Sequence, residues 1–348
     1  MRWKLIRRIF WIVLLLIVLI PAVLYWIAID QDKTYTKAVS ELPLYSDQSE
    51  DGIYRLSTGQ YEFKIRIAGY DNTGDDIILL HGFPQTSATW SPLIKAAADQ
   101  GYRVLAFDQR GYSPGARPAG KENYHIDSLV QDVVGVADAL GLDAFHLVGH
   151  DWGAGVGWKT VIDHPQRIKT WTALSIPHVA VFFDSFLHHP EQKKRSSYIG
   201  FLRLPILPEL LFQVRQKTIF TSIESVWTEE QIKEATAMFR EHGALTATMN
   251  WYRALDYKDE QTIASLQKQV TRPTLFIWGQ HDMAVAPDIV PLQKPWISST
   301  YEELALDAGH SLMQEKTTIV IETILRHWAK EKTQEGRDEE VTTTDHLE

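Results

Sequence analysis

The turn at residues 147–154, Leu-Val-Gly-His-Asp-Trp-Gly-Ala, constrains the fold of this 348-residue chain more than any other segment. An apolar run leads into it, and glycines stand two positions before and two positions after Asp151. This pattern is typical of a buried strand that turns sharply into a helix and holds the middle residue on a strained backbone. We therefore expect Asp151 to be a nucleophile; the alternative is an ordinary aspartate that caps a helix.

The residue type at this turn decides the chemistry. Most enzymes with such a turn carry a serine, which takes an acyl group from its substrate, whereas a carboxylate displaces a leaving group from a saturated carbon. The carboxylate then becomes the acyl part of an ester itself. Alkylating molecules, chiefly epoxides and alkyl halides, are therefore the candidate substrates.

Short apolar runs alternate with helical patterns around the turn. We expect strands at residues 61–68, 77–80, 103–107, 145–148, 170–174, 273–278 and 301–306, and helices at 92–98, 126–140 and 317–330. Fully apolar runs suit strands buried on both faces, and strands that alternate with helices predict a mostly parallel sheet with helices on both sides. The predicted fold class is α/β.

The α/β pattern is interrupted after residue 177 and resumes near residue 267. We expect residues 178–266 to form a helical lid inserted between two strands of the core, which would comprise residues 53–177 and 267–330. Residues 31–52 are polar with no clear period and predict a stalk. The charged, Thr-rich residues 331–348 predict a disordered tail.

The N-terminal segment is the most apolar part of the chain. Residues 9–29 contain no charged side chain, and a helix of this length is enough to cross a bilayer. We therefore expect residues 1–30 to form a basic segment followed by a membrane anchor. Lys4, Arg7 and Arg8 place the N-terminus in the cytoplasm and the catalytic domain on the opposite side. A cleaved signal peptide is the alternative. Trp26 argues against it, because a cleavage site requires a small residue at such a position.

Composition limits the partners and cofactors. The formal net charge of −9, with no basic stripe, argues against a nucleic-acid surface. The absence of cysteine excludes disulfides, thiolate nucleophiles and Cys-ligated zinc. His188 and His189 have no third ligand at a suitable spacing, so we predict neither a metal nor an organic cofactor.

Hydrolysis of an aspartyl ester requires a base, a group that orients the base, and donors for the oxyanion. His310, just after the last predicted strand, is the best base among 13 histidines. Asp282 follows the preceding strand and could orient His310 and fix its tautomer; Asp307 ranks behind it. The backbone N–H groups of Phe83 and Trp152 are the expected oxyanion hole.

Three polar residues near these motifs have structural rather than catalytic interpretations. We expect His81 and Asp108 to shape loops at the carboxyl edge of the sheet through local hydrogen bonds. His150 would lie beneath the turn and pack there rather than act as the base.

Several motifs together resemble the epoxide hydrolase branch of the α/β-hydrolase superfamily, over roughly residues 53–330. The order nucleophile, acid, base is the order of that fold. The motifs are His81-Gly82-Phe83-Pro84, Asp108-Gln109-Arg110-Gly111, Gly149-His150-Asp151-Trp152-Gly153, the pair Trp278-Gly279 with Asp282, and Gly309-His310.

The resemblance implies two lid tyrosines that hydrogen-bond the epoxide oxygen and protonate it as the ring opens. Tyr252, in Asn250-Trp251-Tyr252-Arg253, matches the second of them, and Tyr198 falls where the first would be. The alternative for each is a buried tyrosine whose hydroxyl makes a structural hydrogen bond and takes no part in catalysis. The family often has glutamine after the first tyrosine, whereas this chain has Ile199, which leaves substrate preference open.

Three other functions compete with this one. Haloalkane dehalogenases share Asp151-Trp152 but usually add an asparagine where this chain has Phe83, or a second tryptophan. Fluoroacetate dehalogenases carry an arginine directly after the nucleophile, whereas this chain has Trp152 at that position. A membrane-tethered binding module without activity is the third, because a fold does not fix a function. The sequence favours an epoxide hydrolase that acts on hydrophobic epoxides.

Overall fold

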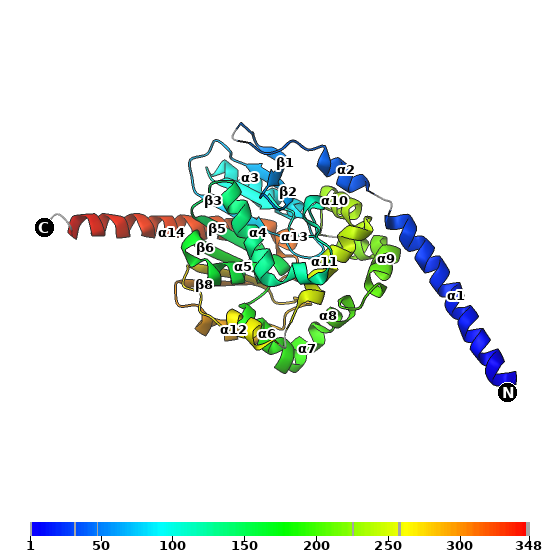
Figure 1. The fold of residues 1–348 in the computed structure, drawn as a ribbon. Coiled ribbons are helices and arrows are strands. Elements are labelled where there is room, and N and C mark those ends of the chain that lie inside the picture. The colour runs from blue at the N-terminus through cyan, green and yellow to red at the C-terminus, as the bar shows by residue number, and fades with distance from the viewer. Residues whose placement is uncertain (1, 31–32, 47, 225, 257–258, 346–348) are drawn as a thin grey trace.

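An eight-stranded sheet forms the centre of the protein in a computed structural model that describes residues 2–30, 33–46, 48–224, 226–256 and 259–345 (Figure 1). The strand order is β1-β2-β4-β3-β5-β6-β7-β8; β2 pairs antiparallel with β1 and β4, and the other neighbours are parallel. The strands are β1 Gly52–Ser57, β2 Glu62–Ala68, β3 Asp76–Leu80, β4 Arg103–Phe107, β5 Phe145–His150, β6 Ile168–Leu174, β7 Thr274–Gly279 and β8 Tyr301–Leu306. The predicted α/β fold class is confirmed.

Both faces of the sheet are covered, as the apolar runs predicted. Successive residues of β3 belong to different cores: Ile78 packs with α4 (Ile126–Ala139) and α5 (Trp152–Asp163), whereas Ile77 and Leu79 pack with α3 (Ser91–Asp99) and α14 (Thr317–Asp345). All three side chains are fully buried. Each such burial stabilises the fold by about 1.5–3 kcal/mol, which fixes the register of this central strand.

A helical segment separates β6 from β7, where the α/β pattern of the sequence is interrupted. It lies on one side of the sheet in Figure 1. Its helices are α6 Val179–His188, α7 Pro190–Arg195, α8 Ser197–Leu202, α9 Leu207–Glu224, α10 Glu229–Phe239, α11 His242–Ala254 and α12 Glu260–Leu266. The buried Glu241 lies between the end of α10 and the start of α11.

The N-terminal region differs from the expected stalk. Helix α1 (Arg2–Asp30) runs outward from the domain, whereas α2 (Thr34–Ser40) packs against the domain (Figure 1). The hydroxyl of Tyr35 donates to Asp108 Oδ2 at 2.8 Å, and the Thr36 backbone N–H donates to Glu241 Oε1 at 2.8 Å. These buried partners hold the segment as a docked helix; residues 31, 32 and 47 of the predicted stalk lie outside the described residues.

The predicted membrane span gains no support from the structure. Across the residues whose placement is described, we find no helix long and apolar enough to cross a bilayer. The predicted span at residues 9–29 includes positions 21 and 24–29, whose side chains lie outside that description.

The C-terminal helix continues beyond the expected end of the domain. α14 runs from Thr317 to Asp345, whereas we expected a disordered tail from residue 331. Glu, Lys, Arg and Gln are frequent between residues 330 and 340, and all four are good helix formers, so the polar composition there is compatible with a helix. The last three residues of the predicted tail, 346–348, are not among the described residues.

Candidate active site

Asp151 lies at the turn between β5 and α5, on the backbone that the sequence predicted. Its φ of 53° and ψ of −121° are outside the regions that side-chain-bearing residues normally adopt. A Cβ atom on Gly153 would overlap the carbonyl oxygen of Leu80, and one on Gly149 would overlap Gly153. The glycines therefore allow the close approach of β3, β5 and α5 that holds Asp151 in this conformation.

Two backbone N–H groups donate to the Asp151 carboxylate. The N–H of Phe83 lies 2.8 Å from Oδ1, and the N–H of Trp152 also hydrogen-bonds this carboxylate. These are the two donors predicted as the oxyanion hole. Because the Phe83 N–H holds Oδ1, the second oxygen, Oδ2, is the one left to face a substrate.

His310 joins the two acidic residues that the sequence assigned to it. Its Nε2 lies 3.2 Å from Asp151 Oδ2, and its Nδ1 lies 2.8 Å from Asp282 Oδ2. The other oxygen of Asp282 accepts hydrogen bonds from the backbone N–H groups of Ala284 at 2.7 Å and Val285 at 3.2 Å. The Asp282 carboxylate is therefore fixed by the backbone, and it orients the imidazole.

The neighbouring charges shift the pKa of Asp151 and of His310. Burial alone would lower the pKa of His310, but the Asp282 and Asp151 carboxylates raise it well above its usual value. Burial likewise opposes ionisation of Asp151, yet the hydrogen bond and charge of His310 bring the pKa of that carboxyl below its usual value. Asp151 is therefore anionic and His310 cationic in the resting site near neutral pH.

Three residues that our sequence analysis did not assign to the site hold the His310 loop. Glu315 accepts hydrogen bonds from the N–H groups of Gly309 at 2.6 Å and Ser311 at 3.0 Å, on either side of His310. His150 Nε2 and Ser175 Oγ lie 2.8 and 2.9 Å from the His310 carbonyl oxygen. A glutamate five positions after the histidine, at the end of the short helix α13 (Leu312–Glu315), was the available signal for Glu315. Ser175 had none, because it comes from a different strand.

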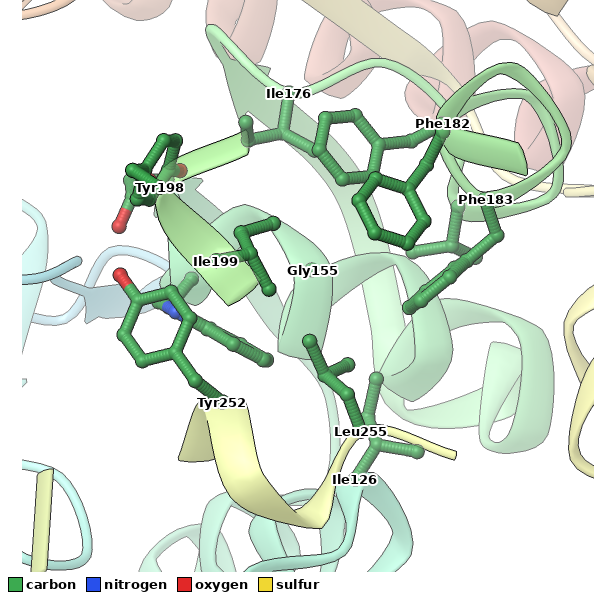
Figure 2. Close-up of a pocket in the computed structure, with 13 residues that line it drawn as sticks. Ile126, Gly155, Ile176, Phe182, Phe183, Tyr198, Ile199, Tyr252 and Leu255 are labelled. Carbon is green, nitrogen blue, oxygen red and sulfur yellow. The ribbon is translucent and has the colours of Figure 1, made fainter. Parts of the chain in front are cut away.

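An apolar cavity opens in front of Asp151, between the sheet and the inserted helices. Tyr198 from α8 and Tyr252 from α11 line one side of it, and their hydroxyl groups face each other in Figure 2. Their ring centroids are 6.3 Å apart. Burial raises the pKa of both hydroxyls, and the nearby Asp151 carboxylate raises it further. Both tyrosines are therefore proton donors at neutral pH.

The Trp152 side chain contacts Tyr252 directly. The two rings meet edge to face with centroids 5.1 Å apart, and the Trp152 side chain hydrogen-bonds the Tyr252 hydroxyl. Because an indole N–H can only donate, the hydroxyl must accept this bond. The proton of Tyr252 is then free to point elsewhere.

The remaining residues singled out in the sequence lie outside the triad. His81 Nε2 accepts from the Gln109 backbone N–H at 3.1 Å, and Asp108 Oδ1 accepts from the Ser87 backbone N–H at 2.7 Å, so both order loops. Asp307 pairs with His281 at 2.8 Å on the surface and not with His310.

One cluster of potential metal ligands occurs away from this site, among the described residues. Glu302, His327 and Glu331 each place one ligand atom within 4.8 Å of the others, at the edge strand β8 and helix α14. Lys330 Nζ lies 2.6 Å from Glu302 and already neutralises that carboxylate. The cluster has no connection to the cavity in front of Asp151.

The fold and the triad define an α/β hydrolase. The family model described as alpha/beta hydrolase fold matches residues 76–317, so the chain belongs to this superfamily. Its homologues and structural neighbours include epoxide hydrolases of the superfamily, and they indicate that the chain is a hydrolase.

Individual relatives cover most of the chain. Epoxide hydrolase 4 of Homo sapiens is 30% identical over 74% of this chain and 74% of its own length. The AB hydrolase superfamily protein YfhM of Bacillus subtilis (strain 168) is 31% identical over 78% of this chain and 96% of its own length. The crystal structure of an epoxide hydrolase from Vigna radiata superposes with a TM-score of 0.68 at 26% identity, covering 82% of this chain and all of that one.

Proposed function

We propose that the protein is an epoxide hydrolase that converts an epoxide into a vicinal diol through an ester of Asp151. The observation that carries this proposal is the pair of tyrosine hydroxyls, Tyr198 and Tyr252, that face each other beside Asp151 in an apolar cavity. An alkoxide is a poor leaving group, so ring opening needs proton donors at this position. The relatives named epoxide hydrolases support the proposal.

In the first step, a lone pair of Asp151 Oδ2 forms a bond to the less hindered epoxide carbon. The carbon–oxygen bond of the ring breaks with its electron pair moving to oxygen, which takes a proton from Tyr252 or Tyr198. The bond from the Trp152 side chain holds the Tyr252 hydroxyl so that its own proton is available. Solvent then returns a proton to the tyrosine.

In the second step, the neutral ester no longer favours the imidazolium, so His310 releases its resting proton to solvent. Its Nε2 then takes a proton from a water molecule, and the resulting hydroxide attacks the ester carbonyl carbon of Asp151. The N–H groups of Phe83 and Trp152, which already donate to this carboxylate, stabilise the oxyanion, which forms on Oδ1, the oxygen that Phe83 contacts. The intermediate collapses, the ester bond to the alkyl group breaks, and His310 gives its proton to the leaving oxygen. This releases the diol and restores the carboxylate.

The same nucleophile would serve a haloalkane dehalogenase, and two contacts make that function less favourable. A dehalogenase needs the indole N–H of Trp152 for the halide, but this side chain hydrogen-bonds Tyr252. Phe83 offers an aromatic ring where many dehalogenases have an asparagine donor. A binding module without activity would not require the buried ion pairs of His310 with Asp151 and Asp282.

The test combines a substrate panel with an isotope experiment. Turnover of small epoxides to diols is expected, with no halide release from haloalkanes of the same size, and the reverse result would replace our assignment. In a single turnover in water enriched in heavy oxygen, the label should enter the Asp151 carboxylate. Label found only in the diol would exclude the ester. Asp151→Asn should abolish turnover, and Tyr252→Phe should reduce ring opening about 10²–10⁴-fold.

We further propose that the helices of residues 178–266 act as a lid on the core formed by residues 53–177 and 267–330. Tyr198, Tyr252 and much of the apolar lining come from this segment, whereas Asp151, Asp282 and His310 come from the core. A substrate would therefore be enclosed between a reactive wall and a proton-donating wall.

We also propose that residues 9–29 attach the protein to a lipid bilayer, with the N-terminus in the cytoplasm and the catalytic domain on the opposite side. The segment contains no charge, and the described apolar side chains of α1, such as Phe10 and Trp11, are mostly exposed. The full chain should remain in the membrane pellet after an alkaline carbonate wash, whereas a variant without residues 1–30 should not. Release of the full chain by the wash would contradict the proposal.

A further inference from the structure

One stretch of the inserted segment exposes an unusual number of apolar side chains. Outside α1, ten large apolar or aromatic residues of the described chain are exposed, and six of them lie within residues 198–214. Five of the six come from α9 and the loop before it, and we call them the α9 patch: Leu204, Ile206, Leu207, Leu211 and Val214. Exposed apolar clusters of this kind mark surfaces that bind a protein or a membrane.

The loop of the α9 patch is fixed to helix α11, which carries Tyr252. Arg203 donates to the Tyr252 carbonyl oxygen at 3.1 Å, and Arg253 donates to that of Leu204 at 2.7 Å. Ile206 has a φ of 68°, a conformation that a β-branched residue rarely adopts. Strain of this kind persists where surrounding contacts impose it, and it is frequent at binding sites. The loop therefore presents Ile206 to the outside in a fixed geometry.

The charges around the α9 patch suit an anionic membrane surface. The two charged residues within residues 196–214 are engaged inside the protein, because Arg203 binds α11 and Glu209 is buried against an arginine of that helix at 2.7 Å. Exposed cations flank this stretch: the two lysines of α7 before it and Arg215 after it. Glu191 of α7 pairs with Arg195 at 3.0 Å. An apolar centre with basic flanks is typical of a surface that lies in the interface of anionic lipids.

The α9 patch lies close both to the N-terminal helix and to the active-site cavity. Helix α1 contacts α11, which in turn packs against α8 and α9, and α1 leaves the domain beside α9 in Figure 1. Tyr198 of α8 lines the cavity in front of Asp151, yet 37% of this residue is exposed. Helix α8 therefore belongs to the cavity wall and also to the outer surface that precedes the α9 patch.

We propose that the α9 patch is a second membrane-binding surface, which inserts into the headgroup region of an anionic bilayer beside α1. The inference goes beyond the proposed epoxide chemistry, and it rests on the proposed bilayer attachment only for the position of α1. Each leucine or isoleucine moved from water into an apolar phase gains roughly tenfold or more in partition, so the patch holds the domain in one orientation on the bilayer. In that orientation the rim of the cavity at Tyr198 faces lipid.

The test uses the full chain, which has no cysteine and can therefore carry a single probe. Leu207→Cys, labelled with a polarity-sensitive fluorophore, is added to vesicles of equal parts phosphatidylcholine and phosphatidylglycerol. We expect blue-shifted emission, quenching by a nitroxide on the lipid, and protection from iodide in the water. Leu292→Cys in η5 (Pro287–Trp296) is the matched control, because both leucines are 53% exposed, and it should show none of these effects.

A second arm changes the α9 patch itself. With the probe at Val214→Cys, the additional change Leu207→Glu should lower the ratio of lipid quenching to iodide quenching roughly tenfold, because a charge replaces an inserted leucine. Leu292→Glu should leave that ratio unchanged. Leu211→Cys replaces Leu207→Cys in the first arm if that variant does not fold by circular dichroism.

Three results would overturn the inference: equal iodide quenching at positions 207 and 292, equal lipid quenching at both, or a position 207 shielded from both quenchers. The last result would assign the α9 patch to a second copy of the chain or to another protein. Failure of the proposed anchor is a separate outcome, since the alkaline wash would release a chain whose position 207 had still been quenched by lipid. Failure to hydrolyse epoxides would leave all the fluorescence results unchanged.

Discussion

Replacing Asp282 by asparagine should separate the two halves of the proposed reaction. The Asn oxygen can keep the hydrogen bonds from Ala284 and Val285, which places its NH₂ group against His310 Nδ1 in place of the carboxylate oxygen. Nδ1 must then accept, so the proton of the neutral ring moves to Nε2, and the nitrogen that faces Asp151 can no longer take a proton from water.

The size of the effect follows from the lost charge and the wrong tautomer. A carboxylate and an imidazolium about 4 Å apart attract by about 4 kcal/mol at a protein-like dielectric constant, so ester hydrolysis should slow by about 10³-fold from the charge alone. An analogous aspartate-to-asparagine change in a serine protease triad costs about 10⁴-fold. We expect a loss of 10³ to 10⁴-fold in hydrolysis, and about tenfold or less in the attack by Asp151.

Rapid quenching followed by intact-protein mass spectrometry distinguishes the two steps. The Asp282→Asn variant should accumulate one substrate mass per chain within the first turnover and then stop. Asp307→Asn is the matched control, because Asp307 pairs with His281 on the surface and should leave the steady state unchanged. If no adduct accumulates while turnover falls, or if the control shows the same loss, our account of His310 is wrong.

Two further predictions concern stability. Burial lowers the pKa of His150 and His178 to about 4, below the value near 6.5 of the unfolded chain, so the unfolded state binds more protons between these values. The contribution of these two histidines to the free energy of unfolding in urea should therefore be complete above pH 6.5 and fall by about 3 kcal/mol for each histidine as the pH drops to 4. Wild type and a variant with both histidines replaced by Asn should differ by a pH-dependent amount over this range, and a constant difference would refute this. In Gly157→Ala, the new methyl group would overlap the buried Trp171 ring, and overpacking should cost about 1–3 kcal/mol. Gly155→Ala on the same helix meets open space, and thermal unfolding should show it to be at least as stable as wild type.

The central part of the fold could be predicted because local pattern and burial agree there. The predicted strands at 103–107 and 301–306 have the bounds of β4 and β8. Each residue from Ile77 to Leu80 of β3 contributes to one of the two cores, so a fully apolar run was an unambiguous signal for a central strand. The order of Asp151, Asp282 and His310 along the chain was also sufficient to predict that they meet, because each follows a parallel strand at the same edge of the sheet.

The parts that could not be predicted depend on partners distant in sequence. Residues 33–42 look polar and irregular by themselves, yet α2 is held because Tyr35 reaches Asp108, 73 positions away, and Thr36 reaches Glu241. The contact between Trp152 and Tyr252 likewise joins the core to the inserted segment. A pattern read along one chain contains no information about which buried acceptor a given hydroxyl will find.

The charge of Asp151 connects the two proposed steps. While Asp151 is anionic, it contributes to the raised pKa of His310, so the histidine keeps its proton and does not compete as a nucleophile. Formation of the ester removes that charge, and the pKa of His310 must fall, because one of the two carboxylates that raise it has become neutral. The base therefore becomes available only after the substrate is attached. The same loss of charge makes a transient tyrosinate at Tyr252 less unfavourable at the moment when its proton is given to the epoxide oxygen. One carboxylate thus serves as the nucleophile and also determines the order in which the other groups act.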